Sequence, residues 1–261
     1  MSKVKTPKIE ELLEAGVHFG HQVRRWNPNM EPYIYTVRKN IHIIDLEQTE
    51  ELLKKAADFL FETAAQGGQI IFVGTKRQAS ELIKKEAERC GALHVTQRWL
   101  GGTITNYRVI KKNIDKLVEY MRKREVGEFD KYTKKERLLL DREIDKLQAS
   151  VGGLIGLSGK PAAVFVIDAK REKTAVREAI RYNIPVVALI DTNSDPTGIK
   201  YVIPGNDDAI KSIVLVLKCL ADAVKEGYEE YAKGGKKVEA EVKTDKKAES
   251  APEKINEKEK A

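Results

Sequence analysis

Short apolar segments alternate with amphipathic helical segments along most of this 261-residue chain, and this alternation constrains the fold more than any other feature. Apolar residues at helical spacing over residues 48–66 stop at a glycine pair, and an apolar run at 69–75 follows. A helical pattern at 77–90 and an apolar run at 92–96 continue the series. Alternating strands and helices predict an α/β fold, with a parallel sheet joined by right-handed crossovers.

The alternation stops after residue 105 and resumes near residue 162. The second part consists of a strand at 162–169, a helix at 172–183, a strand at 185–192, a short strand within 199–206 and a last helix at 207–226. Beyond Gly227 the chain alternates Lys, Glu and Ala and has few apolar residues, a composition that predicts disorder.

Two amphipathic helices occupy the interruption, between about residues 106 and 148. Ile110, Ile114, Leu117 and Met121 fall on one helical face, and Leu138, Leu140, Ile144 and Leu147 fall on a second. A polar connection joins them, so we expect an inserted antiparallel helical hairpin that projects from the sheet domain. Residues 105–150 carry thirteen Lys/Arg and nine Asp/Glu, a net charge of +4. These charges mark either a solvated helix surface or a contact with a polyanion.

The stretch Arg98–Tyr107, with the sequence RWLGGTITNY, suits neither a core strand nor a core helix. Its glycines permit close approach, its Trp and Tyr offer flat faces, and its Arg, Asn and Thr residues offer hydrogen-bonding groups. This mixture suits a ribose-phosphate backbone or an unpaired base. The alternative is an ordinary loop that packs its tryptophan into the core, and for Trp99 itself we expect the core.

The N-terminal part of the chain is less regular. After a short helix that ends at Ala15–Gly16, residues 17–40 are rich in aromatic and arginine residues and show no clear period. We expect an extended, irregular segment with short strands at 33–37 and 41–46.

Composition favours a polyanionic partner. The net charge is +7, the isoelectric point is about 9.1 and 33% of residues are charged. The two cysteines, Cys90 and Cys219, lie in apolar helical patterns without a partner at metal spacing, which indicates buried thiols in a reducing compartment. Neither a secretory signal nor an apolar run of membrane-spanning length is apparent, so we expect a cytoplasmic protein without membrane contact.

A search for enzyme motifs finds only weak candidates. Gly74-Thr75-Lys76 lies between a strand and a helix but lacks phosphate-loop spacing. Asp168, Asp191 and Asp195 follow neighbouring strands, and the alternative function is therefore a Mg²⁺-dependent nucleotide-binding or phosphoryl-transfer enzyme. Capping of the next helix or turn is the expected use of these aspartates, and of Asp45. The four histidines show no complete metal-ligand set. We expect no catalytic residues, cofactor, metal or small-molecule substrate.

Several segments resemble the bacterial small-subunit ribosomal protein S-two family. They include LLEAGVHFGHQVRRWNPNMEPYIYTVRKNIHIIDL, FVGTKRQA, RWLGGTITN and KPAAVFVIDAKREKTAVREAIRYNIPVVALIDTNSDP, and the match extends over residues 9–226. The resemblance implies a Rossmann-like or flavodoxin-like α/β domain with a protruding coiled-coil hairpin, and no catalytic activity. It also implies a ribonucleoprotein role in translation, with binding to small-subunit ribosomal RNA and docking of the largest small-subunit protein.

Together these features divide the chain into four parts. Residues 1–104 form the first part of the α/β domain with its N-terminal extension, 105–150 the hairpin, 151–226 the second part of the α/β domain and 227–261 a disordered charged tail. The residues expected to contact RNA are Arg24, Arg25, Arg38, Lys39, Lys76, Arg77, Arg98, Thr103, Thr105, Asn106, Tyr107, Lys111, Lys112, Arg122, Lys123 and Arg124. Lys76 and Arg77 are included because they begin a helix after a strand, where a phosphate can approach the helix N-terminus.

Overall fold

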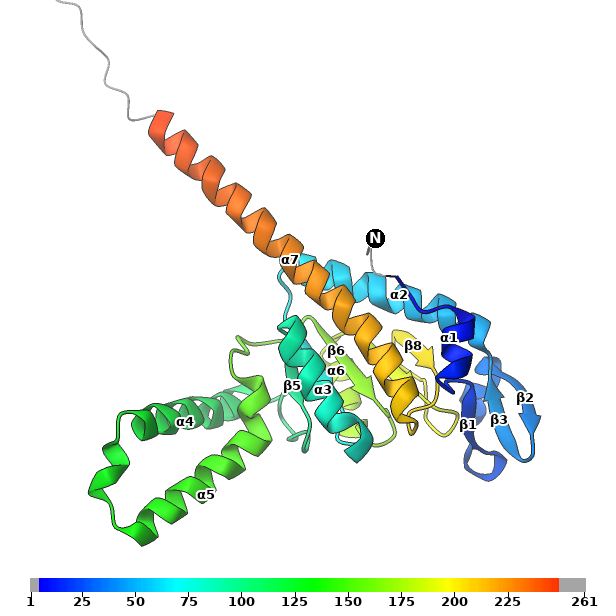
Figure 1. The fold of residues 1–261 in the computed structure, drawn as a ribbon, viewed down its shortest axis with the longest axis horizontal. Helices are drawn as coiled ribbons and strands as arrows, with labels where there is room; N and C mark the ends of the chain where they lie inside the picture. Colours follow the sequence, from blue (N-terminus) through cyan, green and yellow to red (C-terminus); the bar gives the residue numbers. More distant parts are fainter. Residues whose placement is uncertain (1–4, 249–261) are drawn as a thin grey trace, which may run out of the picture.

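A computed structural model describes residues 5–248 and has a five-stranded parallel sheet at its centre (Figure 1). The strands are β4 (Ile70–Val73), β5 (Leu93–Val95), β6 (Ala163–Ile167), β7 (Val186–Ile190) and β8 (Tyr201–Pro204). Their order across the sheet is β5-β4-β6-β7-β8, and every neighbouring pair is parallel. Among these parallel strands the order is 2-1-3-4-5 in chain sequence, which is flavodoxin-like and confirms the expected fold class of the sheet domain.

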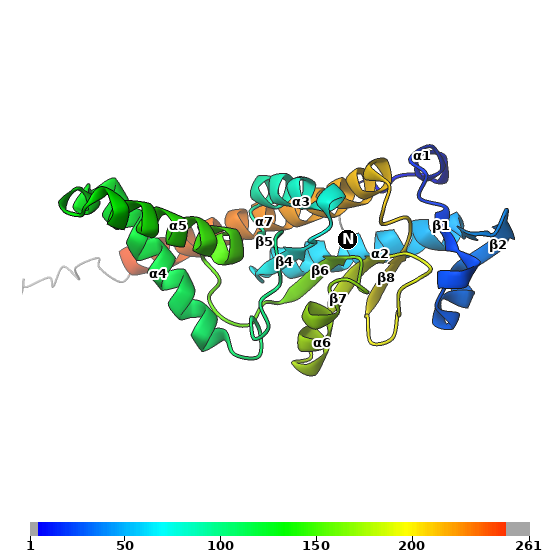
Figure 2. The same ribbon diagram turned by 90° about the horizontal axis from the view of Figure 1, so that it is seen from below.

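Helices cover both faces of this sheet (Figure 2). α2 (Leu46–Ala65), α3 (Arg77–Cys90) and α7 (Ile210–Ala248) pack on one face, and α6 (Lys173–Arg181) packs on the other. Side chains alternate between the two cores, because Phe72 and Phe165 lie on the α2–α3–α7 side whereas Val73 and Val166 lie on the α6 side. Burial on both faces explains why the central strands are apolar without interruption. None of the helices within residues 5–248 is long and apolar enough to span a membrane.

The N-terminal segment is more regular than expected. It contains α1 (Ile9–Glu14), β1 (Phe19–Gln22), η1 (Val23–Arg25), η2 (Pro28–Tyr33), β2 (Ile34–Arg38) and β3 (Ile41–Ile44). The three strands form an antiparallel sheet in the order β1-β3-β2. Lys39 and Asn40 both have positive φ, which suits a tight two-residue turn between β2 and β3. The strands at β2 and β3 confirm the prediction, whereas β1 was missed because its residues show no apolar alternation.

Between β5 and β6 the chain forms α4 (Tyr107–Glu125), η3 (Glu128–Lys131), α5 (Lys134–Val151) and η4 (Gly152–Leu154). α4 buries the predicted residues Ile110, Ile114 and Leu117, and these continue the core on the α6 side of the sheet. On α5 the prediction was partly wrong: Ile144 is buried, but Leu138 is 51% exposed. Helical periodicity locates a face only to within a neighbouring position, and Leu138 lies at its margin.

α7 continues beyond residue 226, where the sequence predicted the last helix to end, and projects past the sheet domain to Ala248 (Figure 1). The prediction of disorder from residue 227 is therefore wrong for the beginning of the tail. The hydroxyl of Tyr228 donates to the backbone oxygen of Gly68 at 3.0 Å, and Tyr231 packs close to Gly67. Lys, Glu and Ala are good helix formers, so the same composition also favours a helix that begins on a packed surface. Residues 249–261 lie outside the described residues.

Candidate nucleic-acid interface

The loop at residues 98–106 is held in place by one buried side chain, Glu178 of α6. One carboxylate oxygen of Glu178 accepts the backbone N–H of Gly102 at 2.7 Å and the indole N–H of Trp99 at 3.4 Å. The other oxygen accepts the backbone N–H groups of Ile104 and Thr105, at 3.0 and 3.2 Å. Glu178 is 8% exposed, so it needs these donors to offset the loss of water. The loop therefore wraps around an anion that the protein itself supplies.

This arrangement determines which loop residues can meet a partner. Trp99 is 5% exposed, which confirms that it belongs to the core. Thr103 is 2% exposed and its hydroxyl donates to the backbone oxygen of Leu100, so it does not reach the surface. Thr105 is half-buried against Glu178. Arg98 and Asn106 remain exposed.

The next predicted residue, Tyr107, begins α4 and is half-buried, with its hydroxyl donating to the backbone oxygen of Leu157. The basic residues of α4 lie on its solvent side, and Lys111, Lys112, Arg122 and Arg124 are exposed. Lys123 is half-buried and forms an ion pair with Glu119 at 2.5 Å. Arg77 is exposed at the beginning of α3.

The N-terminal sheet presents a second group of exposed cations. Arg24 and Arg25 lie in η1 directly after β1, and Arg38 and Lys39 lie at the turn between β2 and β3. Trp26 directly follows Arg25, and its ring stacks on His42, with ring centroids 5.2 Å apart. Tyr35 is 76% exposed on β2. Flexible cations beside exposed aromatic surface are the groups that contact phosphates and bases in RNA-binding proteins.

Lys76 was predicted to contact RNA, but its ammonium group is buried and forms ion pairs with carboxylates of the protein. Its Nζ lies 3.0 Å from Asp168, 2.7 Å from Asp207 and 2.8 Å from Asp208, and the residue is 8% exposed. The N-terminus of α3, which was expected to receive a phosphate, thus lies beside three carboxylates of the protein. The sequence did not reveal these ion pairs, because Asp207 and Asp208 are more than 130 residues away from Lys76.

This cluster occupies the position where a flavodoxin-like sheet ordinarily binds a ligand, at the carboxyl ends of the strands beside the change in strand order. β4 leads into Lys76 and β6 leads into Asp168. Beside them, the Thr75 N–H and hydroxyl both donate to Glu172, at 3.1 and 2.5 Å. A nucleotide phosphate entering here without a bound cation would meet carboxylates at close range, and the lysine at this position is already paired with them.

Burial and ion pairing together shift the pKa values of Lys76 and Asp207 in this cluster. Burial opposes the charge on Lys76, but the Asp207 carboxylate and hydrogen bonds to Asp208 and Asp168 outweigh it and raise the pKa of Lys76. For Asp207, burial and the nearby charge of Asp168 outweigh the attraction of Lys76 and raise its pKa to about 7. Lys76 thus keeps its positive charge, whereas the charge of Asp207 changes near neutral pH.

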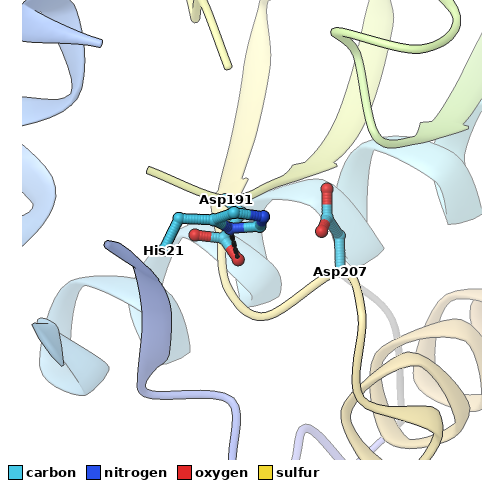
Figure 3. Close-up of side chains that lie close together, drawn as sticks. All are labelled: His21, Asp191 and Asp207. Carbon is cyan, nitrogen blue, oxygen red and sulfur yellow. Dashed lines mark ion pairs between the residues drawn. The ribbon is translucent and has the colours of Figure 1, made fainter. Parts of the chain in front are cut away.

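A histidine from β1 adjoins this cluster. His21 Nδ1 lies 2.8 Å from a carboxylate oxygen of Asp191, and Asp207 lies on the other side (Figure 3). The hydrogen bond to Asp191 raises the pKa of His21, against an opposing effect of burial. Ligand atoms of the three residues lie within 4.8 Å of one another, and Oδ2 of Asp207 is buried without a hydrogen-bond partner among residues 5–248. One imidazole and two carboxylates are suitable ligands for a divalent cation.

The sequence shows no complete metal-ligand set around the histidines, whereas the fold places one imidazole and two carboxylates close together. Sequence spacing missed the set because His21, Asp191 and Asp207 come from three distant segments. Asp168, Asp191 and Asp195, which the sequence suggested as Mg²⁺ ligands, do not form such a group among the described residues. Asp168 pairs with Lys76, whereas Asp195 accepts hydrogen bonds from the Asn29 side chain and the Thr197 N–H, both at 3.1 Å. Asp45 caps α2 through the Glu47 N–H, as expected.

Comparisons with known proteins place the chain among ribosomal proteins. The family model described as Ribosomal protein S2 matches residues 12–227. The chain is 51% identical over 219 residues to Small ribosomal subunit protein uS2 of Maridesulfovibrio salexigens, covering 84% of this chain and 85% of the relative. It is 50% identical over 244 residues to the uS2 protein of Solidesulfovibrio magneticus, covering 94% and 93% of the two chains. It is 52% identical over 219 residues to uS2c of Cyanophora paradoxa, covering 84% and 94%. The expectation that the chain is not an enzyme is confirmed by these relatives.

Proposed function

Because the chain belongs to the ribosomal protein S2 family, we propose that it is a structural constituent of the small ribosomal subunit and binds small-subunit ribosomal RNA. The observation that carries this proposal is the combination of family membership with two groups of exposed cations, one on the N-terminal sheet and one on α4. Its place of action is the cytoplasmic small subunit, where it contributes to translation without a catalytic role of its own.

The proposed RNA contacts retain the exposed part of the predicted set. They are Arg24, Arg25, Arg38, Lys39, Arg77, Arg98, Asn106, Lys111, Lys112, Arg122 and Arg124. Thr105, Tyr107 and Lys123 are half-buried and stand at the margin of this surface. Lys76 and Thr103 are left out, because both are buried and hydrogen-bonded within the protein.

We further propose that α4 and α5 act together as an antiparallel coiled-coil hairpin that grips a neighbouring RNA helix by shape and charge. An ion pair joins the Lys116 ammonium on α4 to the Glu143 carboxylate on α5 at 2.5 Å. Glu143 also accepts the hydroxyl of Tyr120 at 3.5 Å, so two side chains of α4 contact one carboxylate of α5.

Neighbouring small-subunit proteins, including the largest one, are the remaining proposed partners. Family resemblance alone supports docking of the largest protein. Its test is capture of that protein by subunits that carry this chain, compared with subunits depleted of it. Equal capture by both kinds of subunit would remove this part of the proposal.

The main test is sedimentation of a cell lysate through sucrose gradients at low and high salt, with detection of this protein. Contacts dominated by phosphate neutralisation weaken steeply with salt. We therefore expect migration with the small subunit at low salt and release at high salt. A protein that stays at the top of the gradient at every salt concentration would contradict the ribosomal assignment.

A further inference from the structure

A groove separates the N-terminal segment from α6, on the face of the sheet opposite α2, α3 and α7. Its volume is about 650 Å³. Arg25 and Trp26 line one side, Lys170, Lys173 and Arg177 line the other, and Asp195 lies in the 193–197 loop at its margin. Of these residues, only Arg25 belongs to the set predicted from the sequence to contact RNA.

The groove is strongly cationic. Arg25, Lys170, Lys173 and Arg177 are all exposed, and within residues 5–248 none of them forms an ion pair with an acidic side chain. The single lining carboxylate, Asp195, is already hydrogen-bonded to Thr197 and Asn29, and these bonds, with a smaller effect of the Lys173 charge, lower its pKa. Four cations therefore face one acid, in contrast to Lys76, whose charge is neutralised by neighbouring carboxylates.

The groove also offers apolar surface between its cations. Val176 and Ile180 of α6 line it, and Ile180 is 38% exposed. Trp26 lines it from the other side and is braced by its stack on His42. Lys173 and Arg177 are four residues apart and so extend from one face of α6 in successive turns. Spaced cations with flat and apolar surface between them match the alternating phosphates and bases of a nucleic-acid strand.

We propose that this groove holds a strand of small-subunit ribosomal RNA, with backbone phosphates on Lys170, Lys173, Arg177 and Arg25. The inference rests on the proposed RNA-binding function and adds a specific surface to it. An acidic segment of a neighbouring protein is the competing occupant. RNA is favoured because the groove combines its cations with the indole of Trp26, which a ribose or base can contact.

The first experiment measures how salt weakens binding of the full-length protein to small subunits that have been depleted of it. The groove variant carries Lys170→Ala, Lys173→Ala and Arg177→Ala. The control variant carries Lys54→Ala, Lys85→Ala and Lys218→Ala, which remove the same charge from exposed positions on α2, α3 and α7. A plot of log affinity against log salt has a negative slope, and each lost phosphate contact reduces the magnitude of that slope by about 1. We expect the magnitude to decrease by about 2 to 3 for the groove variant and by less than about 1 for the control.

A charge-preserving variant, Lys170→Arg, Lys173→Arg and Arg177→Lys, separates loss of charge from loss of fold, and we expect it to keep the wild-type slope. Equal slopes in the groove and control variants, with wild-type binding intact, would overturn the groove assignment alone. Absence of wild-type binding at every salt concentration would instead overturn the proposed function.

A second readout identifies the occupant. A photo-crosslinking amino acid at position 180, on the exposed Ile180 side chain, should attach to ribosomal RNA when the assembled subunit is irradiated. Attachment to a ribosomal protein in place of RNA would overturn the proposal, because the acidic-segment alternative predicts that product.

Discussion

The carboxylate of Glu178 accepts the backbone N–H of Gly102 at 2.7 Å, and so links α6 to the loop at residues 98–106 across 76 positions of sequence. Three further N–H donors, from Trp99, Ile104 and Thr105, converge on the same carboxylate. The shape of this loop consequently depends on a side chain outside it. α6 also carries Lys173 and Arg177, so one helix positions both the loop and the basic groove.

Replacing Glu178 by Gln tests this dependence. A side-chain NH₂ group cannot accept from the backbone N–H groups that face it, so at least one buried donor loses its partner. We expect the free energy of unfolding to fall by about 1–3 kcal/mol. Denaturant unfolding followed by tryptophan fluorescence measures the change. Glu81→Gln on the exposed side of α3 is the control, and equal stability of the two variants would refute this role of Glu178.

Lys76→Met should destabilise the sheet domain strongly. The substitution keeps the length of the side chain but leaves Asp168 and Asp207 buried without their cation. Breaking a buried ion pair in this way costs about 3–5 kcal/mol. Arg77→Met removes the same charge from the next, exposed residue and serves as the control in urea unfolding. Similar midpoints for the two variants would show that the buried pairing contributes little.

The raised pKa of Asp207, about 7, makes stability depend on pH. The folded protein binds a proton at this carboxyl more tightly than the unfolded chain, whose Asp pKa is near 3.8. The contribution of Asp207 to stability therefore falls as pH rises from about 4 to 7. Asp207→Asn removes this dependence, so the stability of the variant relative to wild type should rise over that range.

Denaturant unfolding between about pH 4 and 6, in the presence of a chelator, measures this difference. Partial or full burial lowers the pKa values of His18, His42 and His94, which opposes the trend, but these histidines are common to both proteins and their effect cancels. Asp195 has a lowered pKa, so its contribution is lost only as pH falls below this window. Asp195→Asn should accordingly show a flat difference, and a flat line for Asp207→Asn would contradict the prediction.

Gly227→Ala should destabilise the contact between α7 and α2. An added Cβ would lie 2.5 Å from the Phe61 backbone oxygen and 2.6 Å from the Ala64 Cβ. This crowding should cost about 1–3 kcal/mol and exceed the gain of about 1 kcal/mol in helix propensity. Thermal unfolding measures the effect, and Gly101→Ala, where nothing lies within 4 Å, is the control. An unchanged melting temperature would mean that the helix does not pack closely beyond residue 226.

Ile144→Ala tests the packing of α5. Ile144 is 3% exposed, and truncation of such a side chain costs about 2–5 kcal/mol. Leu138→Ala is the matched control, because Leu138 is 51% exposed and should change stability by less than about 0.5 kcal/mol. Hydrogen exchange of α5 amides measures both. A larger effect from Leu138 than from Ile144 would contradict the packing of α5 described above.

Local patterns were sufficient for the elements whose environment repeats along the chain. The central strands are buried on both faces, so β4, β6 and β7 appear in the sequence as uninterrupted apolar runs. Asp45 was recognisable as a helix cap because its partners are only two and three residues away. The predicted burial of Cys90 and Cys219, which was based on apolar helical patterns, is confirmed, and so is that of Trp99, which was based on the usual burial of tryptophan.

Interactions between distant segments were not predictable in this way. β1 becomes a strand because β3 pairs with it, and nothing in its own residues requires an extended conformation. The groove likewise exists only where residues near position 25 meet α6.

The sequence by itself determined the alternating elements, the inserted helices and the exposed cations of α4, because periodicity within one segment defines which side is buried. Only the tertiary structure decided that Glu178 organises the loop, that Lys76 faces carboxylates and that His21 meets Asp191. Each of these contacts joins residues that are 70 or more positions apart. A buried charge is stabilised by whichever partners the fold brings within hydrogen-bonding distance, and the order of strands in the sheet sets those partners.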